Sequence, residues 1–515
     1  MEHHGSETYY VIGERLYGES RDGRERTLSA AQEAQVVPFR FTRMGPNGIN
    51  RQLSDGIRRK LAQAMTAGGG AFGSIPAGFT YLGQFVDHDL TFDKTNVMLG
   101  QNISPIQLIQ ARSPSLDLDS LYGAGPTDPG SAQFYEADGI HLKVGTTETA
   151  DGIGPKPGHD LPRGAGSTNA QKRIAVIPDP RNDENLAVAQ THCAFIRFHN
   201  RVVDTLPAST PANQKFAKAR ELVVKHYQWM LRTDYLPRIA AASVVNNVFN
   251  QGRKVFEVGA TPTDVPTMDI EFSVAAFRLG HSMVRGSYNW NKIFDNGAGT
   301  LDFLFGFTAL SGDFLGQRLP SNWIADFRRL YDFSENNKPA LVVPPAQFNR
   351  ARRIDTLLAQ PLAAVPKLTG DDNLAFRNLT RARMVRLATG QQMVTFMKGK
   401  GVNVTKLTNA QIRDGSGGAS LAGLTQAQRQ AVIANTPLWF YILREAELNA
   451  GKLKGVGARI VAETFHRAME GSEHSIVRDT AFKPSLGPNN TTFRMVDLLF
   501  FAFEGKKELL NPVGT

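Results

Sequence analysis

Hydrophobic residues recur with the period of an α-helix over most of the chain beyond residue 184. Between residues 184 and 206 they fall at Ala189, Cys193, Ile196 and Val203, which would lie on one face of a helix. The segment 214–236 shows the same pattern. Strong alternation of apolar and polar residues, typical of half-exposed strands, is scarce. The sequence therefore predicts a mainly α-helical protein with long loops and few short strands.

The same periodicity predicts further helices along the chain. They cover residues 51–66, 271–284, 321–332, 376–387, 389–398, 408–413, 424–434, 438–448, 454–469 and 494–502. Because there is no internal repeat and no domain-sized linker, residues 51–515 are expected to form one large domain. Residues 1–50 are expected to be an irregular N-terminal extension that packs on it. Residues 123–170 are rich in Gly, Pro, Thr and Asp, which indicates a surface excursion with a hairpin at 133–144.

Composition excludes several classes of protein. The single cysteine, Cys193, rules out an intramolecular disulfide, a Cys-rich zinc site and a Cys-ligated iron–sulfur cluster. Lys and Arg number 58 against 48 Asp and Glu, which gives the net charge of +10. No nucleic-acid-binding motif accompanies the basic clusters, so no nucleic-acid partner is expected. The positive field instead favours small anions. The oligomeric state is left open.

Targeting and membrane signals are not recognisable in the sequence. The first residues contain no apolar core of a standard signal peptide. The most apolar runs, Leu438–Leu443 and Leu498–Phe503, are far shorter than the ~20 residues that span a bilayer. We expect a soluble protein that stays in the cytoplasm or is exported without a standard signal.

Two acidic motifs precede residue 123. In the first, Asp87-His88-Asp89 follows Gln84 in an apolar segment. On a helix these neighbours would point in three directions, about 100° apart, and could serve three partners. A surface histidine with solvated carboxylates would look the same. The second motif repeats oxygen-bearing residues at every second position, as a loop that wraps Ca²⁺ would, or as a turn rich in Asp and Ser would. Its residues are Ser113, Ser115, Asp117 and Asp119.

A third motif places Arg181 between a proline and the start of a helix. Asn182 or Asp183 suits the N-cap of this helix, and Glu184 suits its first turn. Capping explains the acidic residues. It does not explain the arginine.

Two further motifs lie in predicted helices. Arg278 and His281 are three residues apart and share a face of an otherwise apolar helix. Such a histidine is usually a core residue with a satisfied hydrogen bond, but it is also how a helix presents imidazole to a haem iron. Asn378 lies in the apolar segment 374–381 and needs a buried hydrogen-bond partner, for which an imidazole N–H is a candidate.

Taken together and in this order, the five motifs resemble those of the animal-type haem peroxidases, the peroxidase–cyclooxygenase superfamily, in a bacterial version. The resemblance runs from about residue 73 to about residue 477. It implies a large single haem-peroxidase domain of the myeloperoxidase-like type.

The resemblance assigns roles residue by residue. Gln84 and His88 match the distal pair that receives H₂O₂, and Arg181 matches the distal arginine. His281 matches the proximal ligand of the haem iron, and Asn378 matches the amide that hydrogen-bonds its other nitrogen. The cofactor would be derived from haem b. The residues matched to its periphery are Asp87 and Glu184, which form esters with haem methyl groups in mammalian members, and Arg278 and Arg381, which lie near the propionates and the proximal side.

The resemblance also implies a bound Ca²⁺. Its ligands would be Asp89, Ser113, Ser115 through its backbone carbonyl, Asp117 and Asp119. Ser113 and Asp119 are conservative departures from the family, which commonly has Thr and Ser at these positions. Asn185 stands where one mammalian member has a methionine bonded to a haem vinyl, so a sulfonium link is not expected.

The implied activity is reduction of H₂O₂ through an oxoferryl intermediate that oxidises bromide, iodide, thiocyanate or aromatic donors. Two alternatives stay open. One is a peroxide- or O₂-dependent fatty-acid oxygenase of the same superfamily, although Arg278 stands where those enzymes have a radical-forming tyrosine. The other is a non-catalytic adhesion protein on this scaffold, although His88, Arg181 and His281 are all present.

Overall fold

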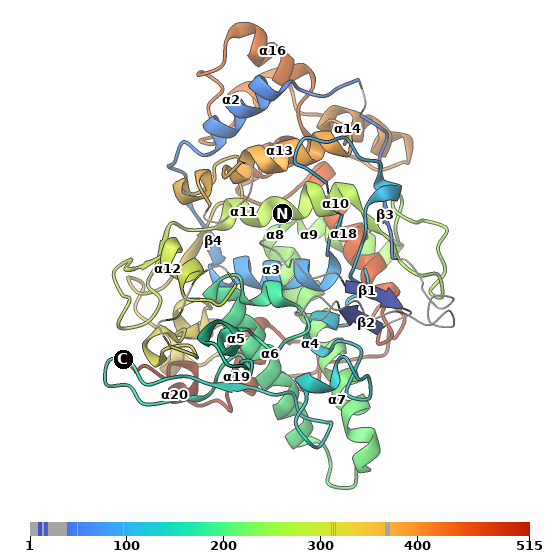
Figure 1. Cartoon of the computed structure of the whole chain (residues 1–515). Coiled ribbons are helices and arrows are strands. Elements are labelled where there is room, and N and C mark those ends of the chain that lie inside the picture. The colour runs from blue at the N-terminus through green and yellow to red at the C-terminus, as the bar shows by residue number, and fades with distance from the viewer. Residues whose placement is uncertain are drawn as a thin grey trace.

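The computed structural model describes residues 39–48, 50–95, 97–310, 312, 314, 316–365 and 371–514, together with the backbone of 9–12 and 15–18. The described chain is mainly helical, as the sequence predicts, and its helices surround α3 and α6 near the middle of the molecule (Figure 1). The α-helices are α2 (Asp55–Met65), α3 (Gly78–Leu90), α4 (Asp119–Tyr122), α5 (Asn169–Arg173), α6 (Leu186–Thr205), α7 (Ala212–Met230), α8 (Leu236–Ile239), α9 (Ala242–Gln251), α10 (Ile270–Val274), α11 (Gly280–Met283), α12 (Leu301–Gly306), α13 (Leu374–Met384), α14 (Gly390–Gly399), α15 (Asn409–Asp414), α16 (Gln426–Ala434), α17 (Leu438–Glu447), α18 (Gly455–Glu470), α19 (Met495–Ala502) and α20 (Lys507–Leu510).

The strands of the described residues pair only two by two. Antiparallel pairs join β1 (Tyr9–Ile12) to β2 (Arg15–Gly18), β4 (Phe72–Pro76) to β10 (Arg350–Arg352), β5 (Gly145–Thr146) to β6 (Pro157–Asp160) and β8 (Ser287–Tyr288) to β9 (Gly299–Thr300). A parallel pair joins β3 (Phe41–Thr42) to β7 (Met268–Asp269). The β1–β2 hairpin lies within the segment expected to be irregular, most of which falls outside the described residues.

Helix α3 lies against α6 through stacked aromatic rings. The ring centroids of Phe85 and Phe195 are 4.5 Å apart with an angle of 17° between their planes. Both rings are fully buried, and burial of such side chains stabilises the fold by roughly 1.5–3 kcal/mol each. Gly83 permits a second close approach, because a Cβ at this position would lie 2.3 Å from the hydroxyl of Tyr235. These contacts fix the helix that carries His88.

The predicted helix 271–284 is broken into three short turns. Ala275, with φ of −131° and ψ of −68°, separates α10 from the 3₁₀ turn η5 (Ala276–Leu279), which leads directly into α11. Arg278 and His281 therefore lie on two consecutive turns of different type. The backbone carbonyl of Arg278 accepts a hydrogen bond from the indole of Trp439 on α17.

The prediction of a helix at 321–332 was wrong. This segment forms two 3₁₀ turns, η6 (Ser321–Trp323) and η7 (Phe327–Arg329). Asp326 accepts a hydrogen bond from the backbone N–H of Arg328 and pairs with its guanidinium. Such local side-chain bonds compete with a continuous helix, which explains the interruption.

The segment 123–170 is exposed or half-buried over most of its length and is anchored by a few buried residues. Tyr135, Leu142, His159 and Leu161 are all buried. The expected hairpin at 133–144 is reduced to a single antiparallel bridge between Tyr135 and Leu142. In the part of the chain that the structure describes, no helix has the length and apolar character needed to cross a membrane.

Several histidines are buried in neutral form. Burial lowers the pKa of His159 to about 3 and the pKa of His199 and His226 to about 4. His226 donates from Nδ1 to the carbonyl of Leu222. Its Nε2 accepts hydrogen bonds from the backbone N–H groups of Ser485 and Leu486, at 2.9 and 3.2 Å. Protonation of Nε2 would leave these two backbone N–H groups without the acceptor that they have in the folded protein.

The depressed pKa of His226 makes folding stability depend on pH. Between pH 6.5 and about 4 the unfolded chain binds a proton that the folded chain does not, so the free energy of unfolding falls as pH falls through this range. At pH 5 the loss from this residue is about 2 kcal/mol. We expect His226→Gln, whose amide retains a donor and an acceptor, to show a shallower loss of unfolding temperature between pH 7 and pH 5.

His141→Gln is the matched control. Burial lowers the pKa of His141, but hydrogen bonds to Asp138 and Asp204 outweigh burial and raise it. Its contribution to stability therefore increases on acidification, opposite to that of His226. Equal pH slopes in wild type and His226→Gln would contradict the prediction.

Candidate active site

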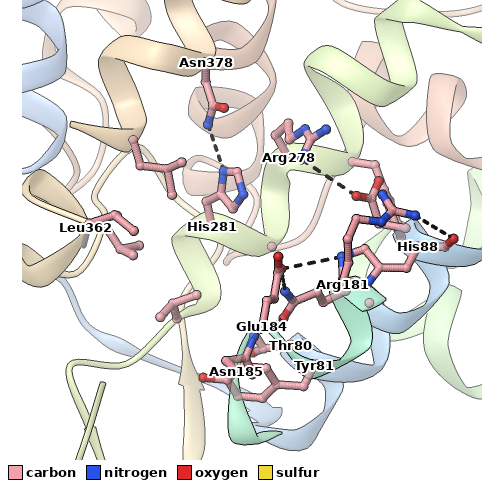
Figure 2. Close-up of a pocket in the computed structure, with 18 of the residues that line it drawn as sticks. Thr80, Tyr81, His88, Arg181, Glu184, Asn185, Arg278, His281, Leu362 and Asn378 are labelled. Carbon is pink, nitrogen blue, oxygen red and sulfur yellow. Dashed lines mark hydrogen bonds and ion pairs between the residues drawn. The ribbon is translucent and has the colours of Figure 1, made fainter. Parts of the chain in front are cut away.

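A cavity of about 250 Å³ lies between α3, α11, α12 and α13. In Figure 2, His281 and Asn378 lie on one side of it, and His88 and Arg181 on the other. Its polar lining includes nine of the residues singled out in the sequence: Gln84, Asp87, His88, Arg181, Glu184, Arg278, His281, Asn378 and Arg381. Segments separated by almost 300 residues thus meet at one site.

The Asp87-His88-Asp89 motif lies on α3, and its three side chains have different partners, as helix geometry predicts. Asp87 accepts a hydrogen bond from Thr91 and is 3.7 Å from the guanidinium of Arg278. The Nδ1 atom of His88 is 2.8 Å from Oδ1 of Asn182. Asp89 is fully buried and faces the loop at 117–120.

Arg181 is held by a buried carboxylate. Its Nε and Nη2 donate to the two oxygens of Asp179, at 3.0 and 2.7 Å, and Nη2 also donates to the carbonyl of His88. Arg112 donates to Asp179 at 2.5 Å. Burial raises the pKa of Asp179, but Arg181 and Arg112 outweigh it and hold the pKa below its ordinary value. The carboxylate stays charged and fixes Arg181 beside the backbone of His88.

Gln84, Glu184 and Asn185 form a second polar group in the cavity. Gln84 donates its amide N–H to Glu184 and accepts a hydrogen bond of 2.9 Å from Asn185. The Oε1 atom of Glu184 is 3.6 Å from Nε2 of His88. Asn185 is also the N-cap of α6, where it accepts from the N–H of Val188, so the expected cap at Asn182 or Asp183 was wrong.

His281 and Asn378 face the cavity from the opposite side. The amide nitrogen of Asn378 on α13 is 2.8 Å from Nδ1 of His281 on α11. The ring of Trp439 approaches the His281 ring edge-on, with centroids 6.4 Å apart. The hydrogen-bond partner that Asn378 was expected to need is therefore His281, which is half-buried.

Arginines gather at one edge of the cavity. Burial lowers the pKa of Arg381; Asp93 opposes this effect, and the like charges of Arg278 and Arg377 add to it. Arg278 donates from Nε to the carbonyl of Ser273. An anionic group at this edge would relieve the mutual repulsion of the guanidinium groups.

The predicted calcium residues lie outside this cavity, behind α3. Burial and the charge of Asp117 raise the pKa of Asp89 to about 7, although Arg112 opposes them. Burial, Asp117 and Asp89 raise the pKa of Asp119 as well. The structure therefore brings three carboxylates close together.

The rest of the acidic loop is hydrogen-bonded to the protein. Asp117 accepts from Ser472 at 2.5 Å, and the hydroxyl of Ser115 donates to the carbonyl of Gly471. Ser113 is half-buried. Within the described ranges, no three His, Cys, Asp or Glu side chains are grouped as a ready metal site.

Several residues of the site were missed from the sequence. Asp179 holds Arg181, and Asn182 and His192 extend from His88 into the core. Tyr81 lines the cavity and donates its hydroxyl to Tyr288 at 2.7 Å. Only Asp179 left a signal in the sequence, as a carboxylate two residues before an otherwise unexplained arginine.

Comparison with known proteins finds similarity over part of the chain. Residues 87–303 match the family described as animal haem peroxidase. Thyroid peroxidase of Mus musculus is 29% identical over 194 residues, which cover 35% of this chain and 20% of that protein. Heme peroxidase 2 of Caenorhabditis elegans is 25% identical over 220 residues, which cover 40% and 29%. The match thus spans less than a third of the length of these relatives.

Similarity to solved structures extends over almost the whole chain. Peroxidase A from Dictyostelium discoideum superposes with a TM-score of 0.57 at 14% identity, covering 96% of this chain and 99% of that one. A fatty acid alpha-dioxygenase from Arabidopsis thaliana gives a TM-score of 0.53 at 10% identity, covering 92% and 77%. These similarities define the fold as that of the peroxidase and dioxygenase group. Residues 87–303 therefore resemble a haem peroxidase domain of the animal type, and the fold of almost the whole chain is shared with solved members of the peroxidase and dioxygenase group.

Proposed function

We propose that this protein is a haem-dependent peroxidase that reduces H₂O₂ and oxidises small anions or aromatic donors. The observation that carries the proposal is the cavity itself. It has an imidazole and a guanidinium, His88 and Arg181, on one side, and an imidazole with an amide partner, His281 and Asn378, on the other.

The residues present fit a haem. His281 would supply the iron ligand through Nε2. Nδ1 would then carry the proton, and the Asn378 amide, whose two ends occupy nearly equivalent positions, would turn its oxygen toward it. The arginines near Arg381 would bind the propionates. When bound, the haem would supply the redox chemistry, because its iron and its porphyrin ring together can give up the two electrons that cleavage of the O–O bond of H₂O₂ consumes.

His88 and Arg181 supply the proton transfer and the charge stabilisation. Nε2 of His88 would take a proton from one oxygen of H₂O₂ and deliver it to the other oxygen, which leaves as water. Arg181 would stabilise the negative charge that develops as the bond breaks. Because Asp179 and the carbonyl of His88 hold its guanidinium, Arg181 needs no rearrangement to do so.

The electron donor is proposed only as a class. The net charge of +10 and the arginine-rich edge of the cavity favour anions such as bromide, iodide or thiocyanate. The apolar side, which includes Leu301, Phe305 and Leu362, suits aromatic donors.

The apolar side is also the observation that favours a fatty-acid oxygenase as the second candidate. Against it, Arg278 occupies the position three residues before His281 and pairs with Asp87. The presence of His88, Arg181 and His281 in the cavity argues against a protein that serves only in adhesion.

The first prediction of the proposed function concerns H₂O₂ turnover. Protein reconstituted with haem should show a Soret band and oxidise a peroxidase dye. His88→Ala should retain the haem but lower kcat/KM for H₂O₂ by roughly 10²–10⁴-fold, the usual contribution of a positioned acid–base group. Stopped-flow spectroscopy with H₂O₂ measures this rate.

The matched control is His141→Gln, a change in a histidine outside the cavity that should leave turnover unaltered. Failure of the wild-type protein to bind haem would contradict the peroxidase assignment. Steady O₂ uptake with an unsaturated fatty acid and no peroxide would favour the oxygenase instead.

A second prediction concerns covalent attachment of the haem. Asp87 and Glu184 both line the cavity, so each carboxylate is available for an ester with a haem methyl group. After treatment with H₂O₂, acid–acetone should leave haem bound to the wild-type protein. It should extract the haem from the double variant Asp87→Asn, Glu184→Gln. Complete extraction from the wild type would disprove both esters.

A third prediction concerns Ca²⁺. Asp89 and Asp117 are buried and Asp119 is half-buried; the three carboxylates repel one another, and their oxygen donors suit a hard cation. Ser113 and the carbonyl of Ser115 would complete the ligands. Chelation with EGTA should lower the unfolding temperature, and added Ca²⁺ should restore it, because a ligand bound only to the folded state stabilises that state.

Asp117→Asn should abolish this dependence on Ca²⁺. Asp138→Asn, which changes an exposed carboxylate outside the loop, is the control. An unfolding temperature that is the same with and without the chelator would contradict the calcium proposal.

A further inference from the structure

A chain of three buried side chains connects the cavity to the core of α6. Nδ1 of His88 is 2.8 Å from Oδ1 of Asn182, and Nδ2 of Asn182 is 2.9 Å from Nδ1 of His192. His88 lies on α3, Asn182 on the 3₁₀ turn η3 (Pro180–Asp183), and His192 on α6. Their exposed fractions are 4%, 0% and 1%.

The amide of Asn182 couples the two histidines through its two different ends. In the orientation that the structure gives this amide, its oxygen faces His88 and can only accept, so Nδ1 of His88 must carry a proton, and Nε2 of His88 is left with its lone pair. Its nitrogen can only donate, so Nδ1 of His192 must accept. Turning the amide over would reverse both bonds, place the proton of His88 on Nε2, and remove the base.

His192 is suited to hold this amide because it stays neutral. Burial lowers the pKa of His192 to about 3. Its ring lies edge-on to Phe85, with centroids 5.7 Å apart. Within the described chain, Nε2 of His192 has no hydrogen-bond partner, so Asn182 is the polar contact that its ring makes.

We propose that Asn182, anchored by His192, is a positioning residue that keeps the proton of His88 on Nδ1 and so makes Nε2 the catalytic base. The inference rests on the proposed peroxidase function. During turnover Nε2 would accept a proton from H₂O₂ and return it to the departing oxygen. The Nδ1 proton would stay on the bond to Asn182 throughout.

Four charged groups surround His88 in the described structure. Glu184 is 3.6 Å from Nε2, and Arg181 donates to the His88 carbonyl. Asp179 lies behind Arg181, and Asp87 precedes His88 on α3. The variants of Asn182 and His192 leave all four of these groups in place.

The experiment uses haem-loaded protein and two readouts. One is the pH profile of the reaction with H₂O₂ by stopped flow. The other is the affinity for cyanide across pH, which involves no turnover but requires a distal base to accept the proton of HCN. Asn182→Asp places a carboxylate on Nδ1, which favours the imidazolium. We expect the acid limb of both profiles to move upward by about one pH unit.

Asn182→Ala removes the acceptor and should slow the reaction with H₂O₂ by roughly 10²-fold with weaker cyanide binding. His192→Phe should act in the same direction, whereas His192→Gln, which can still accept from the amide, should stay within about threefold of wild type. Thr191→Val is the matched control, because the hydroxyl of Thr191 donates to the carbonyl of Ala187 in its own helix.

The outcomes separate the two proposals. Unchanged pH profiles in folded Asn182→Asp, together with an unchanged rate and cyanide affinity in folded His192→Phe and an active wild type, would overturn the positioning role and leave the peroxidase assignment intact. A wild-type protein that binds no haem would overturn both. A shifted pH profile in Asn182→Asp and a slower reaction in His192→Phe, with Thr191→Val like wild type, would support the inference.

Discussion

The buried ion pair between Arg181 and Asp179 is the interaction on which the distal half of the site depends. Arg181 is nine-tenths or more buried, a position that is costly for an unpaired charge. The carboxylate of Asp179 compensates that charge and also accepts a hydrogen bond from Arg112. Arg181 donates a further hydrogen bond to the backbone carbonyl of His88. The guanidinium is therefore fixed relative to α3. In the proposed function, a charge fixed in this way stabilises a developing anion without reorganisation.

Helix α3 connects this site to the acidic loop behind it. Successive residues of the helix point to the cavity edge, the cavity and the loop: Asp87 to Arg278, His88 to Asn182, and Asp89 to the backbone at 118–120. A displacement of α3 would change all three contacts together. Gly83 and Phe85 oppose such a displacement through close contacts with Tyr235 and Phe195. Packing and proposed chemistry thus constrain the same short helix.

The sequence predicts the helical fold and many of the residues that line the cavity. It predicts less well which side chains form hydrogen bonds with those residues. His88, Arg181, His281 and Asn378 stand out because a polar side chain in an apolar segment needs an explanation. Asn182 was interpreted as a helix cap, since its type and position suit one. Asn185 caps the helix instead, and Asn182 joins two histidines ten or more residues away. Local propensity does not distinguish these uses.

The sequence by itself determined that the chain is mainly helical and which polar residues stand out in apolar segments, because periodicity and residue type are local properties. The structure alone decided which side chains meet, since His88 and His281 are brought to one cavity by the packing of α3, α11 and α13. It also decided how each group is held: Asp179 on Arg181, Asn378 on His281, and Asn182 between His88 and His192. Hydrogen bonds between distant segments depend on directions that only tertiary packing fixes.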